Sequence, residues 1–345
     1  MASSKQGLKI TAQLLQQTDT LTKKDINDWR NAHQVALDYE NPNRQRLYDI
    51  YADCELDAHL SGCIAQRKGK VLQKDFRLVD SNGKEDVAAT ELLQQEWFAD
   101  FLGYVLDSAY WGHSLIQLGD VIRGDGVMRY DCVELVPRKH VIPEYGRVVI
   151  NPGDDWRSGI PYREGDFANW CVEVGKPRNL GLLLKCACSY ISKKNMLTFW
   201  DMFGEIFGQP MRIATTNSPD ESERARVEHA LENMGAAFWG LFPEGTNIEI
   251  KESSRGDAYN VFDRRIDRCN SEMSKAILNQ TMTIDSGSSL SQSEVHLEIF
   301  ERTTEADATM AGYTVNGRLL PLMAAHGFPV KGKRFVWNNA ASYTP

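Results

Sequence analysis

Four glutamates in the last third of the chain have the spacing of one helix face. Steps of four, three and four residues separate Glu294, Glu298, Glu301 and Glu305, and residues so spaced are neighbours on a helix surface. Two facing rows of carboxylates can hold paired metal ions, but that design generally includes a Glu-x-x-His unit. His296 and His326 lie at other offsets. The row is therefore either a solvated helix face or an acidic stripe that faces an aqueous channel.

The surroundings of these glutamates favour the channel interpretation. Between Ala276 and Glu301 the sequence contains no lysine or arginine, whereas Asp285, Glu294 and Glu298 are acidic. Each phosphate that a protein neutralises adds affinity through counterion release, so a segment without cations would bind DNA weakly. A conduit for DNA needs weak binding of this kind.

Cysteine and histidine offer a second possible metal chemistry, which the spacing disfavours. Cys54, His59 and Cys63 follow one another at five- and four-residue steps, and on a single helix these steps spread the side chains around the axis. Cys186 and Cys188 are two residues apart in a helical pattern, so they face different ways. The seven scattered cysteines fit a reducing compartment better than a disulfide framework. We expect no metal and no cofactor.

Motifs of common enzymes are missing from the sequence. Residues 62–70 have a Gly and a Gly-Lys pair at the wrong spacing for a phosphate-binding loop. Asp285-Ser286-Gly287 occurs in a loop pattern and not at a strand-to-helix turn, and no zinc-protease helix is present. The sequence thus predicts a protein without a catalytic site.

Composition narrows the class of protein further. The chain has 345 residues, 42% of them hydrophobic, and a net charge of −8, so it can bury a sizeable core in two or three domains. No apolar run approaches the roughly 20 residues that span a bilayer, and the first residues do not resemble a signal peptide. The negative charge argues against a broad basic DNA-binding face. The negative charge is compatible with a protein that surrounds DNA without binding it tightly.

The first half of the chain mixes helices with short strands. Apolar residues at three- and four-residue steps predict one helix over Arg46–Lys74, after a helical stretch near Lys23–Asp38. A further helix is expected over Val87–Ala109. Strands are expected at Phe76–Val79, Ser114–Leu118, Met128–Leu135, Arg147–Ile150 and Trp170–Val174.

The second half contains three long helices. Residues 180–207 form a helix that is apolar on more than one side, with Trp200, Phe203 and Phe207 in one row, so more than one neighbour must cover it. A strand at Met211–Thr215, a helix capped by Ser218 that stops at Gly235, and a strand at Thr246–Lys251 follow. The second long helix covers Asp257–Gln280. After TMTIDSGSSLSQ, the third runs from Ser291 to Ala325, with a kink near Gly312 and Pro321.

Three stretches carry a resemblance to a known family. They are LYDIYADCELDAHLSGCIAQRKGKVL, TFWDMFGEIFGQPMRIATT and ILNQTMTIDSGSSLSQSEVHLEIFERTTEADATMAGYTVNGRLLPLM. Together they resemble the Mu-like branch of the portal proteins of tailed bacteriophages, over most of the chain. The third stretch departs from the family at Asn279, where glycine is expected, and the region after Trp337 looks short.

The resemblance implies an α+β portal fold with long stem helices, a small αβ clip module and a mixed helical and β wing. In this scheme residues 1–179 are the N-terminal arm and wing, 180–207 and 257–280 are stem helices, and 208–256 are the clip. Residues 281–292 are a tunnel loop, and 293–345 are a long wing helix with the C-terminal segment. The alternative for 281–292 is an ordinary flexible linker.

The resemblance also implies a function and a set of site residues. A ring, in general of twelve subunits, would sit at the portal vertex of the virion after assembly in the bacterial cytoplasm. Double-stranded DNA would pass through it, and the terminase large subunit, a head–tail adaptor, and capsid and scaffold proteins would dock on it. The tunnel loop would present Thr283, Asp285, Ser286, Gly287, Ser288, Ser289 and Gln292 to DNA. Glu221, Arg224 and Glu228 would form the partner surface of the clip, and Trp200, Phe203 and Phe207 would pack between subunits.

Two other classes of function remain open on the sequence alone. One is a different ring of the virion, such as a head–tail connector, without contact to a packaging motor. The other is an unrecognised hydrolase that uses aspartate or glutamate. A ring with a central hole and a stem would favour the portal, and a compact monomer would favour an enzyme.

Overall fold

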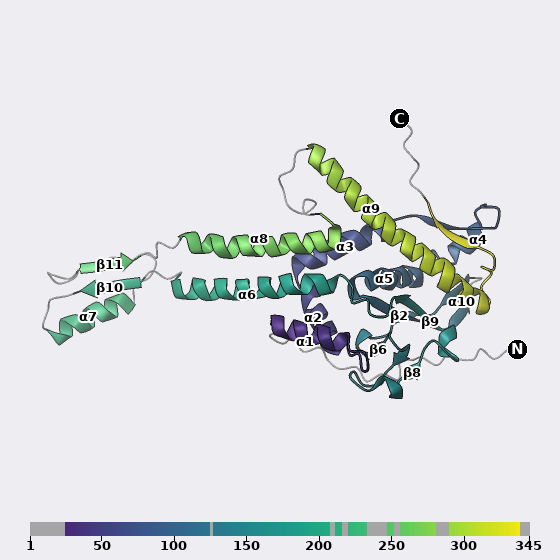
Figure 1. Ribbon diagram of the computed structural model, residues 1–345. Helices are drawn as coiled ribbons and strands as arrows, with labels where there is room; N and C mark the ends of the chain where they lie inside the picture. Colours follow the sequence, from purple (N-terminus) through teal and green to yellow (C-terminus); the bar gives the residue numbers. More distant parts are fainter. Residues whose placement is uncertain are drawn as a thin grey trace. The chain divides into compact units, whose positions relative to one another are not determined.

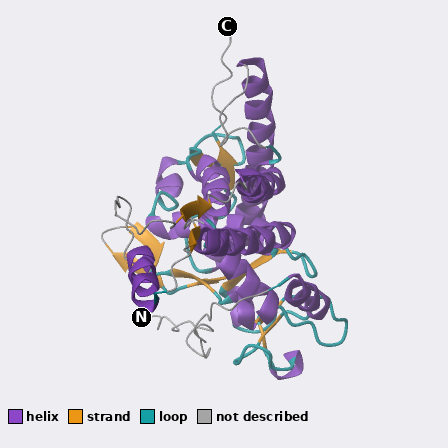
Figure 2. Ribbon diagram, turned by 90° about the vertical axis from the view of Figure 1, so that its left-hand side faces the viewer, coloured by secondary structure: helices purple, strands orange, loops and turns teal. Residues whose placement is uncertain are grey.

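The computed structural model describes residues 25–124, 127–207, 211–215, 220–232, 247–251, 256–280 and 290–338. These residues form two compact units, one made of the described residues up to 191 and from 269 onward, and the other of those within 192–268. Short strands are interspersed among the helices (Figure 2). No helix in the described ranges is long and apolar enough to cross a membrane.

The first unit begins with three helices that the sequence predicts only in part. They are α1 (Ile26–Ala36), α2 (Gln45–Glu55) and α3 (Ala58–Leu72) (Figure 1). The prediction of one helix over 46–74 is wrong, because Asp57 has an extended backbone and its side chain accepts a hydrogen bond from the Leu60 amide. An aspartate in this position starts a new helix. Apolar periodicity continues across the break, which is why the sequence pattern hides it.

The next predicted helix is also divided into two. Residues 87–109 correspond to α4 (Val87–Glu91) and α5 (Glu96–Trp111). Helix α5 ends at Gly112, whose φ of 85° is left-handed. A Cβ at this glycine would lie 2.2 Å from the carbonyl oxygen of Asn179, so only glycine allows the chain to turn here.

Five small sheets are present among the described residues. Strand β2 (His113–Leu118) lies between β5 (Val133–Leu135) and β9 (Cys171–Gly175), and β3 (Val121–Gly124) pairs with β4 (Val127–Tyr130). Strands β6 (Val141–Ile142), β7 (Arg147–Val148) and β8 (Ile160–Pro161) form the third sheet. The predicted strand over 128–135 is therefore two strands, which belong to different sheets.

The fourth sheet joins distant parts of the sequence. Strand β1 (Phe76–Val79) is antiparallel to β12 (Arg334–Trp337), a strand that the sequence did not suggest. One face of this sheet places Phe76, Leu78, Phe335 and Trp337 in a core with α5 and the C-terminal helices. Strand pairing and this core therefore hold the C-terminal strand β12 against the N-terminal half of the chain.

The predicted kink of the third long helix is a π-helical turn. Helix α9 (Leu290–Thr314) is followed by η5 (Val315–Leu319) and α10 (Leu320–Ala325). In this turn the side-chain amide of Asn316 donates to the Phe335 carbonyl and accepts from the Phe335 amide. The wider turn therefore lets a helical side chain bond to the outer edge of β12.

The second unit contains the distal part of α6 (Leu183–Phe207), β10 (Met211–Thr215), α7 (Glu221–Glu232), β11 (Asn247–Lys251) and the first part of α8 (Gly256–Leu278). Strands β10 and β11 are antiparallel, with Met211 opposite Lys251, and together with α7 they confirm the predicted strand–helix–strand order. The cap of α7 that can be described is Asp220, which accepts from the Ser222 amide. The predicted cap Ser218 and stop Gly235 lie outside the described residues.

Candidate functional site

The aromatic row of α6 packs within its own chain. The Trp200 ring is stacked on Phe262 of α8 with 6.4 Å between centroids, and Phe203 lies 5.8 Å from the same ring. Arg265 of α8 donates to the Ser192 hydroxyl of α6 at 2.9 Å. Phe207 is the last residue of α6, and its side chain is outside the description. In a single subunit, Trp200 and Phe203 thus hold the two helices of unit two together.

Apolar side chains remain exposed on both sides of this contact. On α6 the exposed fractions are 41% for Leu197, 52% for Phe199 and 49% for Met202. At about 100° per residue, the arc from Leu197 through Trp200 and Phe203 to Met202 covers about 220° of the helix. Helix α8 packs only against the middle of this arc, at Trp200 and Phe203. Two apolar flanks of α6 therefore face solvent in the isolated chain. The sequence predicted a helix that is apolar on more than one side, but the residues named for packing between subunits were those of the central row alone.

The predicted clip surface lies on α7. Glu221, Arg224 and Glu228 are exposed, and Val227 on the same helix is buried. Steps of three and four residues place the three charged side chains along one side of the helix. This surface is polar, in contrast to the apolar flanks of α6.

Two glutamates of the acidic row of α9 pair with lysines that are distant in sequence. Glu305 pairs with Lys74 of α3, and Glu301 lies 3.9 Å from Lys70 of the same helix. Glu298 pairs with Arg302 one turn further along α9 at 2.6 Å. The side chain of Glu294 is outside the description. Residues 276–301 contain no lysine or arginine, but in space Glu301 lies beside a lysine of α3, which the linear pattern could not reveal.

A buried ion pair lies beneath these exposed pairs. Arg67 of α3 contacts both carboxylate oxygens of Asp307 on α9, at 2.6 and 2.8 Å, and donates to the carbonyl of Ile277 near the end of α8. Burial alone would lower the pKa of Arg67, but the hydrogen bond to Asp307 and its charge raise that pKa above the ordinary value. One guanidinium thus joins the helices α3, α8 and α9.

The end of α8 explains the departure from the family at Asn279. This residue has a φ of 58°, a left-handed conformation that glycine adopts freely and asparagine tolerates better than most residues. Its side-chain amide also donates to the Thr303 hydroxyl of α9 at 3.0 Å. Asparagine therefore supplies the conformation expected of glycine and adds a bond to the next helix.

The predicted tunnel-loop residues lie mostly outside the described part of the chain. This is the case for Thr283, Asp285, Ser286, Gly287, Ser288 and Ser289. Gln292 belongs to α9, which begins at Leu290. Gln280, the last described residue before the loop, is 4% exposed, and neither polar atom of its side chain has a hydrogen-bond partner among the described residues.

The residues considered for metal binding lie on two different helices. Cys54 belongs to α2, and His59 and Cys63 belong to α3, so the argument from one continuous helix was wrong. His59 instead contacts the Ser274 hydroxyl at 2.8 Å, and burial raises the pKa of the Cys54 thiol. No cluster of three or more metal-ligating side chains occurs among the described residues.

Glu173 on β9 is a perturbed carboxylate that the sequence did not indicate. Burial opposes its ionisation, but hydrogen bonds from His113, Arg163 and Tyr162 outweigh burial and lower the pKa of Glu173 to about 2. The donors lie 2.6 to 3.1 Å from its oxygens. Through these hydrogen bonds the carboxylate connects β9 to His113 of β2 and to Tyr162 and Arg163 in the loop after β8.

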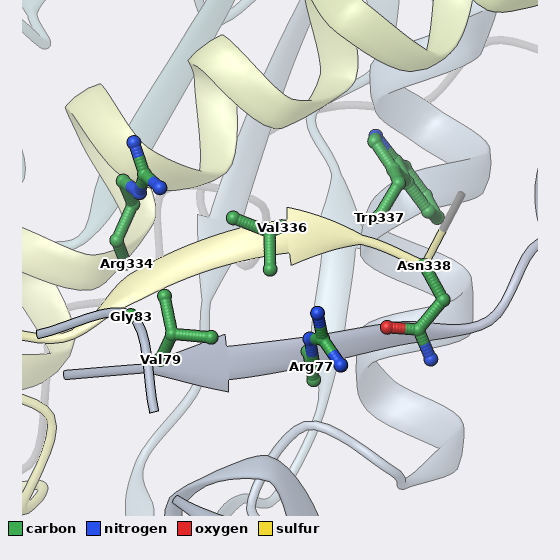
Figure 3. A pocket seen from close by; sticks show the side chains of 7 residues that line it. All are labelled: Arg77, Val79, Gly83, Arg334, Val336, Trp337 and Asn338. Atoms are coloured by element: carbon green, nitrogen blue, oxygen red, sulfur yellow. The ribbon is translucent and has the colours of Figure 1, made fainter. Parts of the chain in front are cut away.

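A basic hollow of about 300 Å³ lies on the outer face of the β1–β12 sheet. Figure 3 shows Arg77 and Val79 on β1 beside Arg334 and Val336 on β12. Cross-strand pairing alternates arginine with valine, because Arg77 is opposite Val336 and Val79 is opposite Arg334. Among the described residues, no carboxylate lines this hollow.

Comparison with solved structures places the fold in a known class. A chain from the virion of a native gene transfer agent particle matches with a TM-score of 0.59 at 12% identity, over 93% of this chain and 91% of that chain. A chain from the neck of an empty gene transfer agent particle, computed with C6 symmetry, matches with a TM-score of 0.56 at 12% identity, over 82% and 81%. An HK97-family phage portal protein from Corynebacterium diphtheriae matches with a TM-score of 0.44 at 13% identity, over 83% and 94%. The mixed helical and β fold is thus shared with proteins of phage-like particles.

The sequence itself matches one family. The family model for the portal protein of Mu bacteriophage matches residues 48–343. This chain therefore belongs to the Mu bacteriophage portal protein family. A search of curated proteins found no match. Membership of the family supports the portal over the other virion rings and the hydrolase.

Proposed function

We propose that the protein assembles into a closed ring, of twelve subunits in the simplest case, through which double-stranded DNA enters and leaves the capsid. The observation that carries this proposal is the pair of exposed apolar flanks on α6. Monomeric soluble proteins avoid large apolar patches. Leu197 lies on one side of the α6–α8 contact, and Phe199 and Met202 lie on the other.

Two different flanks favour a ring over a two-fold dimer. A dimer uses the same patch on both subunits, whereas a head-to-tail contact joins one patch to a different one and closes when the rotation allows. The flank with Leu197 would then meet the flank with Phe199 and Met202 of the next subunit. Residues 183–207 and 256–278 would serve as the stem, and the remainder of unit one as the wing.

The remaining roles follow from family membership and from where the residues lie. The charged side of α7, with Glu221, Arg224 and Glu228, would meet the terminase or the head–tail adaptor. The segment 281–292 would line the channel, where hydroxyl groups make phosphate contacts that carry no sequence information. Capsid and scaffold proteins would surround the ring at the portal vertex, after assembly in the host cytoplasm. The protein would act mechanically, without a catalytic site of its own.

A mixing experiment tests head-to-tail closure. Leu197→Asp and Phe199→Asp each place a charge on one flank, and an unpaired charge in an apolar contact is costly. Each variant alone should lose the ring, as measured by light scattering. A one-to-one mixture should stop at pairs of subunits, because each variant retains the flank that the other lacks.

Thr198→Asp is the matched control, since Thr198 is exposed and lies about 100° around the helix from both positions. This variant should still form rings. Homodimers of either flank variant alone would contradict the head-to-tail arrangement. A wild-type protein that stays monomeric at micromolar concentration would refute the ring itself.

A further inference from the structure

A groove of about 600 Å³ runs beside the N-terminal end of β1, within the usual size range of ligand pockets. The end of α3, the first residues of β1 and the α4–α5 connection form its walls. Leu72, Phe76 and Leu102 are among its apolar lining residues, and Leu72 is exposed. The floor can thus accept aliphatic side chains.

The groove follows a part of the β1 edge that is open. In an antiparallel pair, alternate residues direct their N–H and C=O groups away from the partner strand. At Leu78 these groups are bonded to the Thr90 hydroxyl and to the Asp86 amide. The same alternation directs the N–H and C=O of Phe76 outward, and neither has a partner among the described residues. An extended segment could therefore be anchored there by two main-chain hydrogen bonds, as in β-strand addition.

The rim of the groove is acidic. Asp75, Glu85 and Glu96 are exposed lining residues that form no ion pair within the described residues, whereas Lys74 is neutralised by Glu305. The basic hollow in Figure 3 lies on the neighbouring face and shares only Asn338 with the groove. A basic segment would be repelled by the hollow and attracted by the groove.

The chain contains a segment with the matching pattern outside the described residues. Residues 5–11 read KQGLKIT, with Leu8 and Ile10 alternating with Lys9 and Thr11 and with Lys5 nearby. The period of two fits an edge strand, the two apolar side chains fit the floor, and the two lysines fit the rim. We propose that residues 7–11 of the same chain bind this groove as a short strand beside Phe76.

Two considerations favour this occupant. Residues 339–345, which continue from Asn338, carry no charged side chain and do not complement an acidic rim. Residues 11–24 can reach about 46 Å when extended, and a tethered segment binds at a high effective concentration. The N-terminal segment would thus brace the β1–β12 sheet from its own subunit.

Carbodiimide coupling of the full-length protein tests the position and the source of the segment. This reagent joins lysine amines to carboxylates that are in contact, so Lys9 should couple to Asp75, Glu85 or Glu96. Lys9→Arg keeps the charge and should remove these products. In a mixture of light and heavy isotope-labelled chains, the cross-linked peptides should be light–light or heavy–heavy. Mixed pairs would overturn the assignment to the same chain, and an absence of coupling at all three carboxylates would overturn the site.

Hydrogen–deuterium exchange tests the strand. The peptide Lys74–Val79 should exchange faster, by about tenfold or more at Phe76, when Leu8 and Ile10 are both changed to Asp, since each apolar side chain stabilises the bound state appreciably. Leu14→Asp with Leu15→Asp is the matched control, with the same charge change in the same segment, and should leave Phe76 unaffected. Lys9→Glu should weaken binding by up to about fivefold, and adding Glu96→Lys should restore it. Equal exchange at Phe76 in the wild type and in the Leu8/Ile10 variant would refute the proposal.

Discussion

Replacing Arg67 by methionine should destabilise the first unit more than any loss of an exposed ion pair. The substitution leaves Asp307, which is 8% exposed, without its charge partner and leaves the Ile277 carbonyl without its donor. Removing one partner of a buried pair costs about 3–5 kcal/mol, whereas an exposed pair such as Lys70–Glu301 contributes about 0–1 kcal/mol. The melting temperature should therefore fall by roughly 6–20 °C, at about 2–4 °C per kcal/mol.

The assay is chemical and thermal unfolding, followed by tryptophan fluorescence, of Arg67→Met, Asp307→Leu and the double variant. If the cost comes from a stranded buried charge, the double variant should recover much of the loss, because a buried pair can be replaced by apolar residues at little cost. Lys70→Met is the control for an exposed pair. A loss below about 1 kcal/mol for Arg67→Met would refute the reasoning, since it would mean that Asp307 is solvated when its partner is absent.

Two further predictions concern Glu173 and Asn279. The pKa of Glu173 is lowered from 4.5 to about 2, so its contribution is complete above pH 4.5 and is lost as the pH falls towards 2. Glu173→Gln should lower the free energy of unfolding by up to about 3 kcal/mol at neutral pH and should weaken the loss of stability as the pH falls below 4.5. Urea unfolding at pH 7, 4 and 3 would measure both effects. A variant that loses stability with falling pH as steeply as the wild type would contradict the assignment. Asn279→Ala should lower the free energy of unfolding by roughly 1–3 kcal/mol, because alanine is strained in the left-handed backbone and the hydrogen bond to Thr303 is lost. Asn279→Gly should lower it less, as measured by thermal unfolding. The opposite order of the two variants would be inconsistent with the observed φ.

The sequence was most informative where one periodicity extends over a long segment. The helices at 180–207 and 257–280 and the strand–helix–strand order between them are present, with boundaries that differ by a few residues. It failed where a local capping group overrides periodicity, as Asp57 does between α2 and α3. Strand β12 was missed because its four residues are stabilised by pairing with β1, more than 250 positions earlier, and no local pattern reports such a partner.

The candidate site shows the same limit in its electrostatics. The row Glu294–Glu305 was interpreted as a channel stripe because the sequence has no lysine or arginine between Ala276 and Glu301, yet Lys70 and Lys74 of α3 face two of its members. Helices bring together side chains that are hundreds of positions apart, so a charge pattern along one helix does not define the local potential.

This neutralisation changes the physical argument for weak DNA binding in the proposed channel. Glu301 with Lys70, and Glu305 with Lys74, contribute no net charge at the α3 side of α9. Repulsion of phosphate by α9 could then come only from the first turns of the helix, near Glu294 and Glu298, and Glu298 is itself paired with Arg302. Weak contact with passing DNA would therefore depend on the loop, whose residues 281–289 include five hydroxyl side chains, one aspartate and no cation. Counterion release scales with the number of neutralised phosphates, and a loop of this composition neutralises none.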